Sequence, residues 1–427
     1  MTNLTKDDVF VDVLDATTAR RRVGRGARMA WGIGSERREG VRTARATALG
    51  PEAWELQLLP VRHLEDLAED IASLEKRAAE PNLFFSLPVL RAAYPRLARG
   101  RGREGAIRLL CLWRVGESGE RRLVLFAPLA SPRLGWPGRR TAMVAASPYT
   151  PVGTPLVERD GLADTVERCL AMASDPVLGL PATLALPESR LDGPVAHAFR
   201  KAAERLGLAT ATMEERQRAV LRPGETHALS RRRTRDHERQ MRRLKEQGEV
   251  AFHIAREPVA ILDAFEAFMA LELASWKGRR GTALYNSRPI AAFSRQAVSA
   301  LAERGACAIH SLVLDGRTIA SLIVLGDVRR GEVYTWKTAY DAAFEAQSPG
   351  VLLMLDATER LAKRDVTVDS LAAPDHPVMN RLWASRAAMG TLLVGTRSDA
   401  VGDLRILSAA MDRRERWRER LRRLLGR

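Results

Sequence analysis

The stretch of residues 333–361, which reads VYTWKTAYDAAFEAQSPGVLLMLDATERL, constrains the fold more than any other part of the sequence. β-Branched and aromatic residues alternate up to Tyr340 with the period of two that predicts a strand. A helical pattern then opens on Ser348-Pro349-Gly350, where Ser can cap the first amides, Pro fits the first turn and Gly admits a ligand. Because free N–H groups and the helix dipole converge at a helix N-terminus, the stretch predicts a phosphate or pyrophosphate site. The alternative interpretation is a capped core helix that binds nothing.

The composition is that of a globular protein. Of the 427 residues, 46% are hydrophobic, which is enough to build one large core or two ordinary ones. No apolar run reaches the length of a membrane-spanning helix, and the first residues lack the pattern of a secretory signal. Cys111, Cys169 and Cys307 lie far apart, without the spacing of metal ligands. We therefore expect a cytoplasmic protein with reduced thiols and no metal.

The formal net charge of +16 is concentrated in three basic segments. Residues 20–45, 230–245 and 411–427 carry net charges of +7, +6 and +5, so the rest of the chain is close to neutral. The first segment is rich in Gly and Arg and has almost no aliphatic period, which predicts that residues 1–50 form a disordered basic arm.

The last basic segment has a different pattern, because its apolar residues fall on one face of a helix. They are Trp417, Leu421, Leu424 and Leu425. The pattern predicts a basic amphipathic helix within residues 399–427, which either lies on an anionic membrane surface or packs on the body of the protein. Few aromatic residues and no recognition module accompany the Arg clusters, which disfavours nucleic acid as a partner.

The predicted elements form two similar halves, each with an antiparallel hairpin followed by strand, helix and strand. The expected helices are residues 63–79, 162–173, 195–206, 229–244, 259–276, 289–304, 349–362 and 377–387. The expected strands are residues 107–115, 122–130, 141–146, 182–187, 307–314, 318–326, 332–340 and 367–371. This order predicts an α/β fold with mixed sheets that have helices on both faces.

Short motifs occur in a defined order along the chain. They are Phe84-Phe85-Ser86, Gly248-Glu249-Val250, Ser275-Trp276-Lys277-Gly278, Leu314-Asp315-Gly316-Arg317, Tyr340-Asp341 before Ser348-Pro349-Gly350-Val351-Leu352-Leu353, and Asp369 with Trp383. As a set they resemble the signature of CelD-like acyltransferases, a branch of the GNAT superfamily associated with bacterial polysaccharide and envelope biosynthesis. The two-half arrangement is also similar to that of the Fem-type aminoacyltransferases.

This resemblance implies two tandem GNAT-like domains. Residues 51–212 would be the N-terminal domain, which shapes the substrate site, and residues 213–398 the C-terminal acyltransferase domain. In such a fold the strand before Ser348 and the strand at residues 367–371 splay apart and admit the pantetheine arm of acyl-CoA. The first half has no Ser-Pro-Gly at its matching helix, so we assign the donor to the second half.

Amide formation from a thioester needs a neutral amine, stabilisation of the oxyanion and a proton for the leaving thiol. The candidate catalytic residues are Asp341, Asp369 and His376. The candidate donor-binding residues are Ser348, Gly350, Val351 and Trp336, and those for the acceptor are Lys277, Trp276 and Tyr340. Glu272 is a further carboxylate that can face the cleft. Each has a structural alternative: a cap for Asp341, a helix-end cation for Lys277 and core packing for the aromatic residues.

The sequence therefore predicts an acyl-CoA-dependent N-acyltransferase that acts on an amine of a sugar, a nucleotide sugar or a lipid in envelope biosynthesis, at the inner face of the membrane or in the cytoplasm. One alternative is a Fem-like transferase that uses aminoacyl-tRNA. Another is an enzyme that acylates a long-chain, sphingoid-type amine at the membrane. A third is a non-catalytic accessory protein of a polysaccharide synthase, since Val378-Met379 stands where the CelD-like family carries a Tyr-Lys pair.

Overall fold

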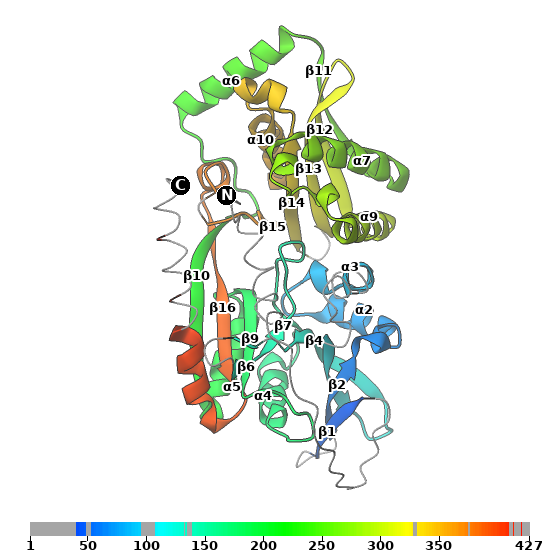
Figure 1. Ribbon diagram of the computed structural model, residues 1–427, viewed down its shortest axis with the longest axis vertical. Helices are drawn as coiled ribbons and strands as arrows, with labels where there is room; N and C mark the ends of the chain where they lie inside the picture. The colour runs from blue at the N-terminus through cyan, green and yellow to red at the C-terminus, as the bar shows by residue number, and fades with distance from the viewer. Residues whose placement is uncertain are drawn as a thin grey trace, which may run out of the picture. The chain divides into compact units, whose positions relative to one another are not determined.

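The computed structural model (Figure 1) describes residues 40–47, 53–94, 107–131, 133–134, 139–327, 331–374 and 376–409, together with Arg413 and Arg420. The chain forms two compact units. The first unit comprises Met1–Asn82, Gly105–Glu215 and Gly390–Arg427, and the second comprises Leu83–Glu104 and Arg216–Met389. Within the described ranges, no helix has the length and apolar character needed to cross a membrane.

The first unit is a mixed sheet covered by helices. Its strands follow the order β1 (Arg42–Thr47), β2 (Ala53–Pro60), β3 (Arg108–Val115), β4 (Arg121–Ala130), β7 (Ala142–Val144) and β9 (Thr183–Arg190). β7 and β9 run parallel and are joined through α4 (Leu162–Ala173), whereas the earlier pairs are antiparallel. The remaining elements are α2 (Ala68–Arg77), α5 (Pro194–Arg205), the 3-10 turns η1 (Val61–Leu64) and η8 (Ser398–Ala400), and the short strands β5 (Arg133–Leu134), β6 (Arg139–Arg140) and β8 (Leu156–Val157).

The second unit repeats this order. Its strands are β11 (Val250–Ala255), β12 (Cys307–Leu314), β13 (Arg317–Asp327), β14 (Glu332–Tyr340) and β15 (Thr367–Asp369). The first four pair antiparallel in sequence order, and β14 pairs parallel with β15 through α10 (Pro349–Ala362). Its other helices and turns are η2 (Leu83–Phe85), α3 (Leu87–Ala93), α6 (Arg231–Lys245), α7 (Pro258–Ala274), α8 (Trp276–Arg279), η5 (Leu284–Asn286), α9 (Arg288–Glu303), η7 (Ala342–Gln347) and α11 (Met379–Leu382). The chain passes between the units after Asn82 and after Glu104, and again within β10 (Thr210–Leu221) and β16 (Arg386–Gly395).

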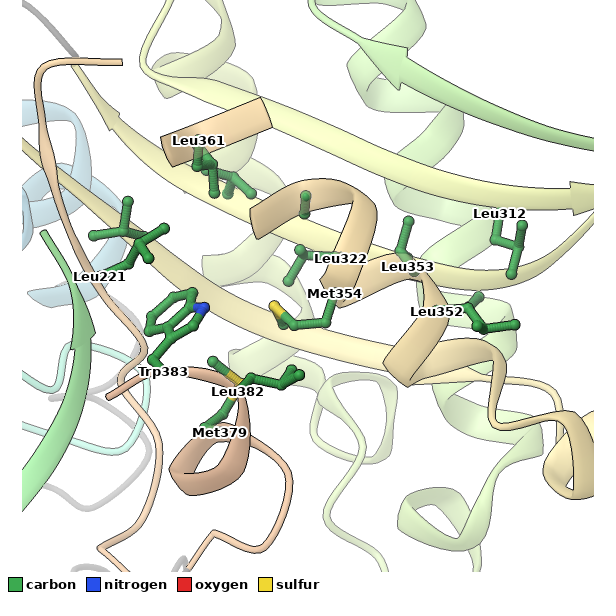
Figure 2. Packing of buried hydrophobic residues seen from close by; sticks show 14 of the residues in the cluster. Leu221, Leu312, Leu322, Leu352, Leu353, Met354, Leu361, Met379, Leu382 and Trp383 are labelled. Carbon is green, nitrogen blue, oxygen red and sulfur yellow. The ribbon is translucent and has the colours of Figure 1, made fainter. Parts of the chain in front are cut away.

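A buried apolar cluster fixes α10 in the second unit. Leu352, Leu353 and Leu361 of α10 pack with residues of β12 and β13 and with Trp383, which is fully buried (Figure 2). The indole Nε1 of Trp383 donates a hydrogen bond of 3.0 Å to the Thr358 hydroxyl. Since a buried indole N–H needs a partner, this bond fixes the orientation of the ring against the helix. The N-terminus of α10 therefore has a defined place next to the end of β14.

The predicted fold class, a mixed α/β protein with two similar halves, is confirmed. The predicted helix at residues 377–387 is wrong, because only Met379–Leu382 are helical and Arg386–Gly395 form a strand. The alanines of this segment favour a helix. However, β16 lies between β9 and β10 in the sheet and pairs with both, and this pairing overrides the local preference. The strands β2, β10 and β11 were not predicted.

Two boundaries also differ from the prediction. Arg42–Thr47, assigned to the basic arm, form β1 because they pair with β2 along their whole length. Leu83–Phe85, assigned to the first domain, belong to the second unit, where the ring of Phe84 lies 5.2 Å from that of Tyr334. Residues 1–39 and 48–50 of the predicted arm lie outside the described residues.

The predicted C-terminal amphipathic helix is described only in part. Residues 401–409 are helical, and Leu404 and Leu407 are buried in the core of the first unit with Ala182 and Ala185. Trp417, Leu421, Leu424 and Leu425, which form the predicted membrane-facing stripe, lie outside the described residues.

Candidate functional site

The parallel pair between β14 and β15 is short. It begins where Glu332 pairs with Thr367 and ends where Tyr334 pairs with Asp369. β15 ends there, whereas β14 continues to Tyr340. In the described part of the chain no strand pairs with residues 335–340 on the side of β14 that faces away from β13. We call this side the open edge.

The register shows which backbone groups point to the open edge. The amide of Asp341 donates to the carbonyl of Ile319 over 2.8 Å. Asp341 and Ile319 therefore form a hydrogen-bonded pair, and the two kinds of pair alternate along an antiparallel ladder. It follows that Tyr340 with Ala320, and Thr338 with Leu322, are non-hydrogen-bonded pairs of β13 and β14. The N–H and C=O groups of Thr338 and Tyr340 therefore point away from β13. A ligand with amide groups can pair with them as an added strand.

An ammonium group lies at this edge. Lys277 Nζ donates to the carbonyl oxygen of Thr338 over 2.9 Å and to Glu272 Oε1 over 3.1 Å. Glu272 is fully buried, and its other oxygen accepts from the amide of Leu284 over 2.8 Å. An ammonium has three N–H donors, and its contacts with the described residues use two of them, which leaves one donor that a ligand can take.

The turn between α7 and α8 brings these two side chains together. Ser275 ends α7 and caps α8, since its hydroxyl donates to the carbonyl of Glu272 and accepts from the amide of Lys277. The turn requires glycine at position 278, because a Cβ on Gly278 would overlap the carbonyl oxygen of Leu273. Trp276 is 39% exposed beside this turn, with the guanidinium of Arg280 5.0 Å from its ring centre.

The turn before α10 differs from the sequence prediction. Ser348 is in the left-handed conformation (φ 50°, ψ 52°), and its hydroxyl caps no amide of the helix. Instead the hydroxyl accepts a hydrogen bond of 3.3 Å from Gln240 of α6, while the carbonyl of Ser348 accepts from the amides of Val351 and Leu352. A non-glycine residue with positive φ is strained, and such strain is concentrated at functional turns.

Gly350 follows at the first turn of α10 and leaves space next to Tyr340. A Cβ on Gly350 would lie 3.4 Å from the ring atom Cδ1 of Tyr340, which is an ordinary contact. The protein itself therefore does not require glycine here, whereas a ligand approaching the helix amides does. Burial, with the neighbouring Glu345, raises the pKa of the Tyr340 hydroxyl, so this side chain stays neutral near pH 7.

Asp341 has a clear structural role. Its Oδ1 accepts from the amide of Ala343 over 2.9 Å and caps η7, and its Oδ2 forms an ion pair with Arg317. His376 Nδ1 accepts from the amide of Met379 over 3.2 Å at the start of α11. Asp369 forms a buried ion pair of 3.3 Å with Arg218 and accepts from the amide of Leu371.

The structure does not bring the two predicted carboxylates together. Asp369 pairs in register with Tyr334, whereas Asp341 follows the far end of β14. Tyr334 and Asp341 are seven positions apart, which corresponds to about 23 Å at the rise of a strand. The residues that do gather around the end of β14 are Lys277, Thr338, Tyr340, Ser348 and Gly350. Trp336 is buried at the bulge between β13 and β14.

The basic helix α6 lies beside the same turn (Figure 1). His237, Gln240, Met241 and Leu244 are its least exposed residues in this part of the helix, and Met241 and Leu244 join the core. Six arginines occupy the opposite, solvent-exposed face: Arg231, Arg232, Arg235, Arg239, Arg242 and Arg243. This cationic face extends over about 18 Å.

Sequence reasoning missed the Glu272–Lys277 pair because the two residues are five apart, which is not a helical contact spacing. Their contact arises from the break at Ser275, a feature that no periodicity predicts. The buried pair of Arg218 and Asp369 was missed for a similar reason, since its members are 151 residues apart.

Comparison with known proteins identifies one domain. Residues 230–376 match the family model of the acetyltransferase (GNAT) domain. The match lies within the second unit and includes the open edge, α10 and the α7–α8 turn. It supports a transferase of the GNAT acyltransferase type. No curated protein matches the sequence.

Solved structures of similar chains share little sequence with this protein. The C-terminal domain of a putative lysylphosphatidylglycerol synthetase from Agrobacterium fabrum is 12% identical, with 81% of this chain and 96% of that chain covered and a TM-score of 0.48. L-PGS from Bacillus licheniformis is 10% identical, with coverage of 80% and 96% and a TM-score of 0.46. FemX is 12% identical, with coverage of 79% and 98% and a TM-score of 0.48. At this level the likenesses carry no argument about function.

The ion pair of Asp369 gives the first prediction. Asp369→Asn removes a buried counter-charge of Arg218, so the free energy of unfolding should fall by about 3–5 kcal/mol. The double variant Arg218→Met/Asp369→Asn should recover a large part of this loss, because the buried guanidinium is removed together with the carboxylate. Urea-induced unfolding measures both. Unchanged stability of the single variant, with a lower transfer rate, would make Asp369 a catalytic residue instead.

Proposed function

We propose that the protein is an acyl-CoA-dependent N-acyltransferase whose donor site lies in the second unit. The observation that carries the proposal is the open edge of β14, which ends next to the N-terminus of α10. The match of residues 230–376 to the GNAT domain supports the same reading.

The two parts of the site suit the two parts of coenzyme A. The pantetheine arm contains amide groups, which can pair with the N–H and C=O groups of Thr338 and Tyr340. Its pyrophosphate is an anion, which the dipole of α10 favours at the helix N-terminus. The amide of Gly350 is the donor we assign to it, because those of Val351 and Leu352 donate to the carbonyl of Ser348. Gly350 leaves the space that this approach requires.

In the proposed reaction the amine nitrogen attacks the thioester carbonyl carbon, the C–S bond breaks, and coenzyme A leaves as its thiol. The developing oxyanion would accept hydrogen bonds from an amide at the open edge and from the remaining donor of Lys277. The amine must lose a proton, and the thiolate must gain one. We assign the base to Asp341, which follows Tyr340 directly, with His376 as the second candidate.

From the resemblance to CelD-like proteins we propose an acceptor of envelope biosynthesis: an amine of a sugar, a nucleotide sugar or a lipid. A long-chain amine at the membrane belongs to this set. Residues 411–427 would support attachment to an anionic membrane surface through the predicted stripe. The non-catalytic alternative rests on Val378-Met379, which replaces the Tyr-Lys pair of that family.

A second candidate function is transfer from aminoacyl-tRNA, as in Fem-type enzymes. The observation that favours it is the cationic face of α6, because a row of exposed arginines next to a donor site suits a phosphate backbone.

Gly350 tests the donor site. Gly350→Glu should lower the affinity for coenzyme A and acetyl-CoA at least about tenfold, because it adds bulk and negative charge where the pyrophosphate would bind. Gly350→Ala is the control for the fold, since its Cβ meets only an ordinary contact. Isothermal titration with melting curves measures both variants. Unchanged affinity in a folded Gly350→Glu protein would rule out pyrophosphate binding at the N-terminus of α10.

The base assignment is tested by two neutral variants. Asp341→Asn keeps an oxygen that can cap η7 but removes the charge, so single-turnover transfer should fall roughly 10²-fold or more. His376→Gln should have a smaller effect. The opposite ranking, in variants with native melting temperatures, would make His376 the base.

The cationic face of α6 distinguishes the two donors. Arg235→Gln/Arg239→Gln/Arg242→Gln should leave coenzyme A affinity unchanged, because these side chains are exposed on the face of α6 opposite Gln240, the residue that contacts the turn before α10. If the donor is aminoacyl-tRNA, the same variant should bind tRNA about tenfold more weakly and with a smaller salt dependence. Arg397→Gln/Arg405→Gln, which neutralises exposed arginines elsewhere, is the control.

A further inference from the structure

The helix α7 is apolar on both faces. Its inward face, with Ile261, Phe265, Phe268 and Met269, is buried in the second unit. Its outward face is exposed, yet it carries Val259, Ala260, Leu262, Ala267, Ala270, Leu273 and Ala274. A surface helix of a globular protein is ordinarily polar on the side that faces water. The outward face of α7 therefore indicates a partner.

Exposed large apolar side chains gather at this place. Among the described residues, five of the seven exposed large hydrophobic side chains lie on α7 or within the eleven residues that follow it. They are Val259, Leu262, Leu273, Trp276 and Tyr285, of which Val259 is 73% exposed. Together with the alanines of the outward face they form what we call the α7 surface. Exposed apolar groups that gather in this way mark a binding surface, whereas single exposed ones need no explanation.

Arginines and aromatic rings border the α7 surface. Exposed Arg256 precedes the helix, and Arg279, Arg280 and Arg288 follow it. The guanidinium of Arg280 lies 5.0 Å from the ring centre of Trp276, and that of Arg295 lies 5.7 Å from that of Tyr285.

Three acids, Glu257, Asp263 and Glu266, are also exposed there. Glu266 is neutralised by two hydrogen bonds from Arg295 of 2.6 and 2.8 Å, which also hold the pKa of this carboxyl below its ordinary value.

We propose that the α7 surface docks the protein on an anionic lipid bilayer. Val259, Leu262 and Leu273 would enter the boundary between headgroups and acyl chains. Trp276 and Tyr285 would lie at the level of the headgroups, and the arginines would pair with lipid phosphates.

Two observations favour a bilayer over a second copy of the chain. A two-fold contact through the α7 surface would bring its terminal arginines near those of the partner copy, with like charges facing each other. Anionic headgroups complement the same arginines. In addition, Trp276 of the α7 surface is directly followed by Lys277, whose ammonium binds the open edge at Thr338. Docking would therefore bring the bilayer close to the proposed transfer site.

This placement names the acceptor class, and that part rests on the proposed function. An amine that resides in the bilayer, with its headgroup at the interface, would reach the open edge without leaving the membrane. Docking itself needs no transfer activity.

The test is flotation of the full chain with vesicles of phosphatidylcholine containing phosphatidylglycerol. Val259→Asp/Leu262→Gln should lower the partition coefficient about tenfold or more, since two apolar side chains are lost from the contact. The fold should be retained, because Val259 lies in the first turn of α7, where Asp is favourable. Val177→Asp is the matched control, an exposed valine of the first unit that should bind as the wild type does.

Quenching of tryptophan fluorescence by brominated lipid provides a second readout. Trp276→Phe should remove most of the quenching if the α7 surface meets the bilayer, and should leave it intact if binding depends on residues 411–427 alone. Absence of vesicle binding by the wild type overturns the proposal, as does wild-type binding by the double variant. A dimer in sedimentation that Val259→Asp/Leu262→Gln dissociates would show that a second copy covers the surface.

Gly350→Glu separates this proposal from the proposed function. It should float with vesicles as the wild type does and fail to bind coenzyme A. A wild-type protein that floats but binds no coenzyme A would contradict the donor site and leave docking intact. One that binds coenzyme A but does not float would contradict docking alone.

Discussion

The early end of the parallel pair between β14 and β15 is the constraint on which the proposed site depends. Had β15 continued beyond Asp369, the backbone groups of Thr338 and Tyr340 would be used within the sheet. Two fixed contacts hold this edge in place. Lys277 binds the carbonyl of Thr338, and the buried Glu272 holds Lys277, so that α7 and β14 are joined where a donor would lie. Because Glu272 is fully buried, its carboxylate requires these partners.

Most secondary structure of the second unit follows from local pattern. The helix at residues 349–362 and the strand at residues 332–340 were predicted with the bounds that the structure shows, because each has a clear period and a clear start signal. β16 and β10 were not predicted, since their pairing partners come from distant parts of the chain. The assignment of Leu83–Phe85 to the second unit has the same cause.

The position of the turn at the candidate site was predictable, but the contacts of its residues were not. The sequence indicated an anion site at Ser348-Pro349-Gly350, and α10 does begin there at the end of β14. It did not indicate that Ser348 would be left-handed or bonded to Gln240, because that contact joins residues 108 apart. The sequence offered Asp341, at the end of one strand, as the first candidate carboxylate and Asp369, on the neighbouring strand, as the second. In the structure Asp341 pairs with Arg317, and Asp369 pairs with Arg218. Asp369 also lies beside Tyr334, far from the end of β14 that Asp341 follows, so the two carboxylates have different roles.

Hydrogen–deuterium exchange with acetyl-CoA tests the central claim most directly, because it reports on single stretches of backbone. If the donor pairs with the open edge and its pyrophosphate meets α10, exchange should slow in residues 335–340 and in the first turn of α10. The strands β2–β4 of the first unit should exchange as they do without ligand. Protection confined to the first unit, or no protection at residues 335–340 at a saturating ligand concentration, would contradict the account.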